Sequence, residues 1–177
     1  MKNSVKIAVC GLSTALSVVL MFVCGFFYSL TYVAPLVLGF LMLMICKTFG
    51  AKSAFCVYFA SAFLSLILVS QKESAVIYTL FFGYYPIIKQ YLDKVKPKFL
   101  SVILKLLIFN ACIALTEIIC VYILGIPFFD DGVFSVSMIV MFAVLMNIVF
   151  IFYEIALKYF KIVYERKFEK RLIKIFK

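Results

Sequence analysis

The sequence contains no histidine and no tryptophan, and only 15% of its 177 residues are charged. Without histidine, the Ser-His and Cys-His pairs of nucleophilic catalysis cannot form, and no cluster of carboxylates suits a hard metal ion. The six cysteines include no CxxC pair and lie within apolar runs, so we expect them to act as small apolar side chains. These absences argue against an enzyme, a bound cofactor and a disulfide-stabilised fold.

Acidic residues are also scarce, with 8 Asp and Glu against 18 Lys and Arg, which gives a formal net charge of +10. The basic residues lie at the ends of apolar runs and in the C-terminal segment. This distribution is typical of membrane proteins, in which basic residues orient the chain and attract anionic lipid. We therefore expect membrane lipid, and not nucleic acid, as the partner of the basic surface.

Long uncharged apolar runs dominate what is present. Residues 7–46 and 132–153 contain no charged side chain, and the whole chain is 67% hydrophobic. A helix needs about 20 apolar residues to cross a bilayer, whereas a soluble domain of this size could not solvate such a surface. The sequence predicts an all-α, multi-pass protein of a cell membrane, with a bacterial cytoplasmic membrane as the expected location.

The apolar runs divide into six predicted spans followed by a basic tail. The run 7–46 is long enough for two crossings, and Gly83 and Pro86 indicate a kink or a non-helical piece in the short fourth span. We expect a transmembrane domain at 1–157 and a separate tail at 158–177. The predicted spans are 7–27, 31–46, 53–70, 75–88, 99–124 and 133–157.

The basic residues sort to one side of this six-helix bundle. With a cytoplasmic N-terminus, sixteen of the 18 Lys and Arg residues fall on the inner side; Lys72 falls outside, and Lys105 falls within the fifth span. Both termini are therefore expected in the cytoplasm. The tail carries apolar residues at helical spacing among its basic residues, which predicts an amphipathic helix that lies on anionic lipid or docks on a partner subunit.

Glu117 is a charged residue inside the predicted fifth span. A charge at mid-membrane costs roughly 2.5–3.5 kcal/mol on insertion scales, so the side chain should face the bundle interior or a wet cavity. One interpretation is a polar anchor in a substrate pocket that opens to the exterior. The alternative is a structural hydrogen bond between helices.

Two asparagines occupy matching positions in the last two spans. Asn110 precedes Glu117 by seven residues, and Asn147 precedes Glu154 by the same spacing. We expect the asparagines to lie at similar depth and to meet across an antiparallel pair of spans, chiefly as inter-helix hydrogen bonds and secondly as pocket lining. Lys105 and Glu154 are expected near the inner boundary, where they can pair with each other or extend toward the headgroups.

The first span contains a small-xxx-small pattern at Gly11 and Ala15. Small residues at this spacing allow a second helix to approach closely. The pattern is compatible with packing inside the bundle and with packing on a separate membrane protein.

The chain resembles the substrate-binding S-component of energy-coupling factor (ECF) vitamin transporters. The shared features are a basic N-terminus, a first helix rich in small residues, five further spans in about 180 residues and no ATPase domain. The resemblance implies a six-helix protein that captures a micronutrient from outside and docks on a transmembrane coupling subunit and two ATPases. In that family an Ala-xxx-Ala pattern on the first helix faces the coupling subunit, and the matching positions are Gly11 and Ala15. Family pockets lie in the outer half, where Glu117 falls.

The resulting function hypothesis is a substrate-binding subunit of an ATP-driven, vitamin-type uptake system, with ATP hydrolysed by separate subunits. Its expected small-molecule contacts are Glu117, Asn110 and Asn147. Many family pockets stack the ligand on tryptophan, which Tyr28, Tyr32, Tyr78 and Phe81 could replace. The alternatives are a non-transporting scaffold or accessory protein of the cell envelope, and an intramembrane enzyme that depends on Glu117.

Overall fold

The computed structural model describes residues 3–27, 30–125 and 136–168, and within these ranges the chain is helical and contains no strand. A helix satisfies every backbone polar group within its own segment, which an apolar environment requires. The elements are α1 (Asn3–Cys24), α2 (Val33–Phe49), α3 (Ala51–Leu68), α4 (Lys72–Ile77), the π-helix η2 (Tyr78–Phe82), α5 (Tyr85–Leu92), α6 (Lys98–Ile118), the π-helix η3 (Ile119–Ile123), α7 (Val136–Val163) and the π-helix η4 (Tyr164–Phe168).

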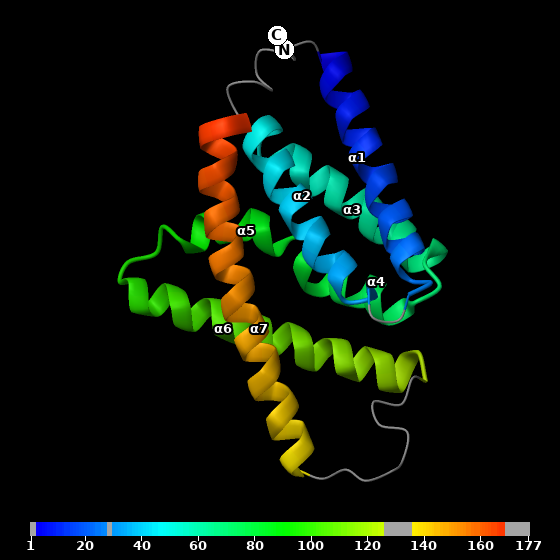
Figure 1. Cartoon of the computed structure of the whole chain (residues 1–177), viewed down its shortest axis with the longest axis vertical. Coiled ribbons are helices and arrows are strands. Elements are labelled where there is room, and N and C mark those ends of the chain that lie inside the picture. The colour runs from blue at the N-terminus through cyan, green and yellow to red at the C-terminus, as the bar shows by residue number, and fades with distance from the viewer. Residues whose placement is uncertain (1–2, 28–29, 126–135, 169–177) are drawn as a thin grey trace.

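The helices form two groups that differ in direction (Figure 1). Helices α1, α2 and α3 pack against one another in alternating directions, and α7 runs along α2. Helices α5 and α6 lie across this group, and α6 passes α7 at a crossing. Most of the buried core residues lie on α2, on α3 and in the segment from α4 to α5.

Hydroxyl side chains on the apolar helices are satisfied within their own helix. Ser17 donates to the Ser13 carbonyl at 2.8 Å, and Thr116 donates to the Cys112 carbonyl at 2.9 Å. Ser61 donates to the Val57 carbonyl at 2.8 Å and also bonds the Tyr78 hydroxyl at 2.7 Å. Bonds to the carbonyl four residues earlier allow small polar residues to lie in an apolar environment.

The short fourth segment is broken, as Gly83 and Pro86 predict. Its α-helical start widens into the π-helix η2, the chain turns at Gly83 and Tyr84, and Pro86 lies in the first turn of α5, where its missing N–H costs little. Helix α3 supports this break, because the Tyr58 hydroxyl donates to the Thr79 carbonyl at 2.6 Å.

An aromatic cluster forms the centre of the core. Phe81 stacks on Tyr85 with ring centroids 4.5 Å apart, and Phe82 meets Tyr153 of α7 edge to face at 5.0 Å. Each of these side chains is buried. Gly39 of α2 allows Tyr153 to approach, since a Cβ at this position would collide with the Tyr153 hydroxyl. The cluster therefore joins α2, the broken segment and α7.

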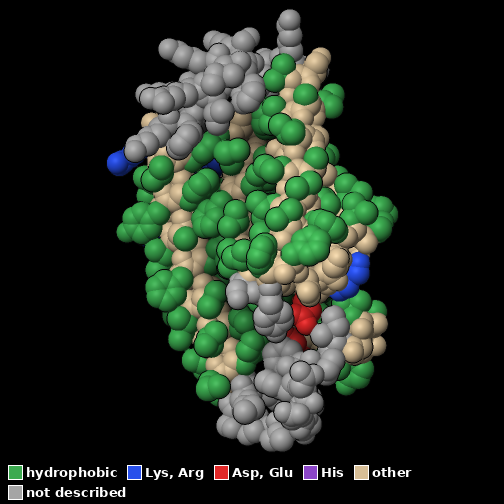
Figure 2. All heavy atoms as spheres, turned by 45° about the vertical axis from the view of Figure 1, so that its right-hand side comes forward, with side chains coloured by type: hydrophobic (Ala, Val, Ile, Leu, Met, Phe, Trp, Pro, Cys, Tyr) green, Lys and Arg blue, Asp and Glu red, His purple; other side chains and the backbone are tan. Residues whose placement is uncertain are grey.

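Four of the described helical segments are long and apolar enough to cross a membrane, and the apolar helix α2 is slightly shorter. Apolar side chains cover most of the face drawn in Figure 2. These features are compatible with a membrane location, and the six crossings and the cytoplasmic termini stay predictions. The four segments are Ser4–Cys24, Ala51–Leu68, Lys98–Ile123 and Val140–Arg166.

Two details differ from the expected bundle. The predicted fifth and sixth spans do not run antiparallel side by side, because α6 crosses α7 (Figure 1). The last helix also does not end at Leu157: α7 continues to Val163, and η4 extends it to Phe168. The first part of the expected tail is therefore a continuation of the long helix, and residues 169–177 lie outside the described part of the chain.

The close packing at Gly83 gives a test of this core. A Cβ at Gly83 would lie 2.5 Å from Tyr58 Cδ2 and 3.0 Å from the Tyr78 carbonyl oxygen. We expect Gly83→Ala to lower the free energy of unfolding by about 1–3 kcal/mol through overpacking. Gly11→Ala is the control, because its Cβ would meet nothing within 4 Å. Reversible unfolding in detergent measures both variants, and equal stability would contradict the packing.

Candidate functional site

The site forms where α6 crosses α7, and the contact begins with two stacked aromatic rings. Phe109 and Phe150 are buried, with ring centroids 4.5 Å apart and planes 17° apart. Along both helices an ionic layer lies on one side of these rings and an amide layer on the other. These three layers fix the position of α6 on α7.

The ionic layer is centred on Glu154. Its carboxylate pairs with Lys89 of α5 and lies 3.3 Å from Lys105 Nζ of α6, while Tyr85 donates a hydrogen bond to it. Lys105 also pairs with Asp93. Both lysines are buried, so each positive charge depends on these carboxylates for compensation.

This layer corrects one expectation and confirms another. Lys89 falls between the predicted spans 75–88 and 99–124, but it is buried in α5, where it pairs with Glu154. The position of Glu154 near the inner boundary stays a prediction. The pair between Lys105 and Glu154 is present.

The amide layer joins Asn110 to Asn147. Each amide nitrogen donates to the other residue's Oδ1 at 3.0 Å, so two reciprocal hydrogen bonds link the helices. Asn110 Nδ2 also donates to the Leu106 carbonyl, and Asn147 Nδ2 donates to the Ala143 carbonyl, both at 2.8 Å. The predicted inter-helix contact is therefore present, at a crossing of the helices.

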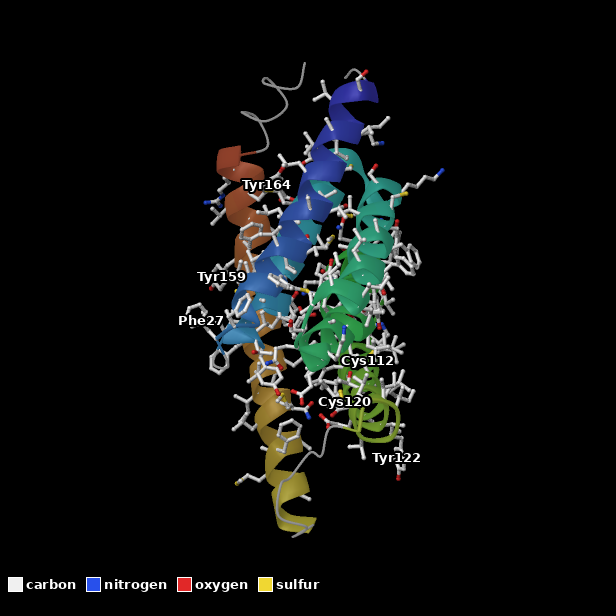
Figure 3. The ribbon with its side chains drawn as sticks, turned by 90° about the vertical axis from the view of Figure 1, so that its right-hand side faces the viewer. Phe27, Cys112, Cys120, Tyr122, Tyr159 and Tyr164 are labelled. Carbon is white, nitrogen blue, oxygen red and sulfur yellow. The ribbon has the colours of Figure 1, made fainter. Side chains whose placement is uncertain are left out.

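A cavity of about 480 Å³ opens beside the amide layer, between the C-terminal part of α6 and the first part of α7. Asn110, Ala114 and Ala143 are exposed, so the cavity is open at the protein surface. Tyr122 lies at its rim and points away from the other helices (Figure 3). The lining residues are Asn110, Ile113, Ala114, Glu117, Ile118, Val121, Tyr122, Phe142, Ala143 and Met146.

Glu117 is the charged residue of this lining. Its side chain is partly buried and takes part in none of the ion pairs or hydrogen bonds between described residues. Glu73 of α4 is near enough to act on Glu117 electrostatically, and it accepts a hydrogen bond from the Tyr32 hydroxyl at 2.7 Å.

The aromatic residues of the cavity differ from those expected. Tyr78 and Phe81 are buried in the core, Tyr32 binds Glu73, and Tyr28 lies outside the described residues. Phe142 and Tyr122 line the cavity instead.

The sequence carries a signal for the α6 wall of the cavity. Extending the helical spacing of Asn110 and Glu117 by one further turn reaches Val121 and Tyr122, which complete one face of α6 and η3. No comparable pattern singles out Phe142, because its role follows from the crossing of the two helices.

The small residues of α1 face outward. Gly11 and Ala15 are exposed, and a Cβ at Gly11 would meet nothing within 4 Å. Packing within the chain uses a different face of α1, on which Ser13 and Ser17 are buried. The described helices therefore do not use Gly11 and Ala15 for packing inside the bundle.

The chain matches no protein-family model, and comparisons with curated proteins and with solved structures give no significant match. The function of the cavity is therefore argued from its own residues.

Within the described ranges, no three His, Cys, Asp or Glu side chains are grouped to hold a metal ion.

The ionic layer predicts a large difference between two ion pairs. Glu154→Leu leaves Lys89 buried without its carboxylate, and we expect the free energy of unfolding to fall by about 3–5 kcal/mol. Glu165→Gln is the control, because Glu165 pairs with Lys47 at 2.9 Å in a more exposed position and should lose less than about 1 kcal/mol. Unfolding in detergent measures both, and similar losses would show that the layer adds no specific stability.

Proposed function

We propose that the protein is the small-molecule-binding membrane subunit of an uptake system, in which separate subunits hydrolyse ATP. The observation that carries the proposal is the cavity between α6 and α7, which sets one carboxylate in an apolar wall. Its volume of about 480 Å³ lies within the roughly 300–1,000 Å³ of typical small-molecule sites. Glu117 serves as the polar anchor. Asn110 supplies an amide to the lining and is held by Asn147, which is not itself a lining residue.

The exposed surface of α1 supports the second part of the proposal, docking on a coupling subunit. Gly11 and Ala15 leave a shallow strip without protein contacts, beside the exposed side chains of Leu12 and Leu16. A strip of this kind allows close approach of a partner helix. In the proposed transporter it contacts the coupling subunit, as the resemblance to S-components implies.

A non-transporting scaffold is the second candidate. The observation that favours it is the extent of exposed apolar surface on α1, α3 and α7, which gives partner helices several places to pack. A scaffold needs no ligand, so occupation of the cavity distinguishes the two candidates.

The cavity can be tested by filling it. We expect native mass spectrometry of the protein, purified in mild detergent, to show a retained small molecule that is lost in Ala143→Phe, because the added ring occupies the cavity. Val144→Phe is the matched control: it adds the same ring at the next residue, which is exposed and outside the lining. Absence of any retained molecule in the wild type, or equal occupancy in both variants, would contradict the proposal.

Docking is tested on the outer face of α1. The double variant Gly11→Leu and Ala15→Leu should keep its melting temperature, because both sites are exposed, yet should lose co-purification with the coupling subunit and ATPases. Ala60→Leu is the control, since Ala60 is an exposed small residue of α3. Co-purification from membranes measures the effect. Intact complexes in the double variant would remove this face from docking.

A further inference from the structure

We propose that the cavity between α6 and α7 binds a small organic monocation, a molecule with one positive charge on an apolar or aromatic body. This inference rests on the proposed function, because it names the chemical class of the molecule that the binding subunit takes. Charge, hydrogen-bonding capacity and wall composition support it separately.

The first argument is the charge around Glu117. Two of the described lysines at the crossing are already engaged: Lys89 and Lys105 pair with Glu154 and Asp93. Lys72 of α4 donates to the Leu66 carbonyl at 2.9 Å.

The charge that does act on Glu117 is the like charge of Glu73. No described cation pairs with Glu117, and a partly buried carboxylate of this kind is stabilised when a positively charged ligand pairs with it.

The second argument is that the lining amide, Asn110, has no N–H left to donate to a ligand. Both hydrogens of Asn110 Nδ2 are used, one for the Leu106 carbonyl and one for Asn147. Asn147 Nδ2 is used in the same way. The bonds to backbone carbonyls fix the orientation of both amides, because flipped amides would set two oxygens against each other.

The cavity therefore offers mainly acceptors: the Glu117 carboxylate and the remaining lone pair of Asn110 Oδ1. The Tyr122 hydroxyl can donate or accept, but it lies at the exposed rim. A carboxylate or phosphate ligand would face Glu117 without a donor from the lining amide. An organic cation fits the same surroundings, since it carries the opposite charge and needs no donor from the cavity.

The third argument is the composition of the wall. Seven of the ten lining residues have wholly apolar side chains. Phe142 and Tyr122 add aromatic rings, which attract cations as well as apolar groups. Among the described lining residues Glu117 is the one carboxylate, which matches a single positive charge. We therefore expect a ligand with an apolar body and one positive charge.

The test uses a matched pair of probes on the full-length protein in lipid nanodiscs. Radiolabelled benzyltrimethylammonium is the cation, and unlabelled neopentylbenzene, which replaces its nitrogen by carbon, is the neutral competitor. The anion 4-phenylbutyrate is the third probe. We expect saturable binding of the cation that neither competitor displaces.

Glu117→Gln should weaken cation binding by about tenfold to a hundredfold, because it removes a charged interaction from a half-buried site. Glu165→Gln should bind like the wild type, since Glu165 lies outside the cavity. No binding of the cation, displacement by the neutral or anionic probe at equal concentration, or an unchanged Glu117→Gln would overturn the inference.

Failure of the inference is distinguishable from failure of the proposed function. If neopentylbenzene or 4-phenylbutyrate binds and Ala143→Phe abolishes that binding, the cavity is a ligand site, and only the charge class is wrong. If the wild type retains no molecule and Ala143→Phe changes the binding of no probe, both proposals fail.

Discussion

Helices α6 and α7 touch over a short length, so three layers at their crossing carry the contact between them. The stacked rings of Phe109 and Phe150 lie between the ion pairs of Glu154 and the reciprocal hydrogen bonds of Asn110 and Asn147. Because the helices cross, they diverge beyond the amide layer, and the cavity lies in that divergence. A parallel pair of helices would close this space with side chains.

The two carboxylates in the apolar parts of α6 and α7 have opposite surroundings. Glu154 has two lysines and a tyrosine hydroxyl around it, so its charge is compensated within the protein. Glu117 has no such partner among the described residues, and Glu73 adds a like charge. The first arrangement is typical of structural ion pairs, and the second is typical of a site that takes its counter-ion from outside.

Patterns of neighbouring residues in the sequence predict the helices of this fold better than they predict how the helices are oriented relative to one another. Uncharged runs indicate the long helices, Gly83 and Pro86 indicate the broken fourth segment, and the matching asparagines indicate a contact between the last two helices. The crossing of α6 over α7 and the burial of Lys89 were not predictable in this way. Both depend on contacts between residues far apart in sequence, such as Lys89 and Glu154, which hydrophobic periodicity does not encode.

The proposed docking face and the cavity belong to different parts of the molecule. Helix α1 packs mainly on α3 and α2, whereas the cavity is formed by α6, η3 and α7. A partner helix on Gly11 and Ala15 would therefore leave the cavity walls in place, and a ligand at Glu117 would not touch α1. Because the two surfaces share no element, substitutions at one should leave the structure of the other intact. Docking and binding are thus separable by experiment, and each proposal can fail without the other.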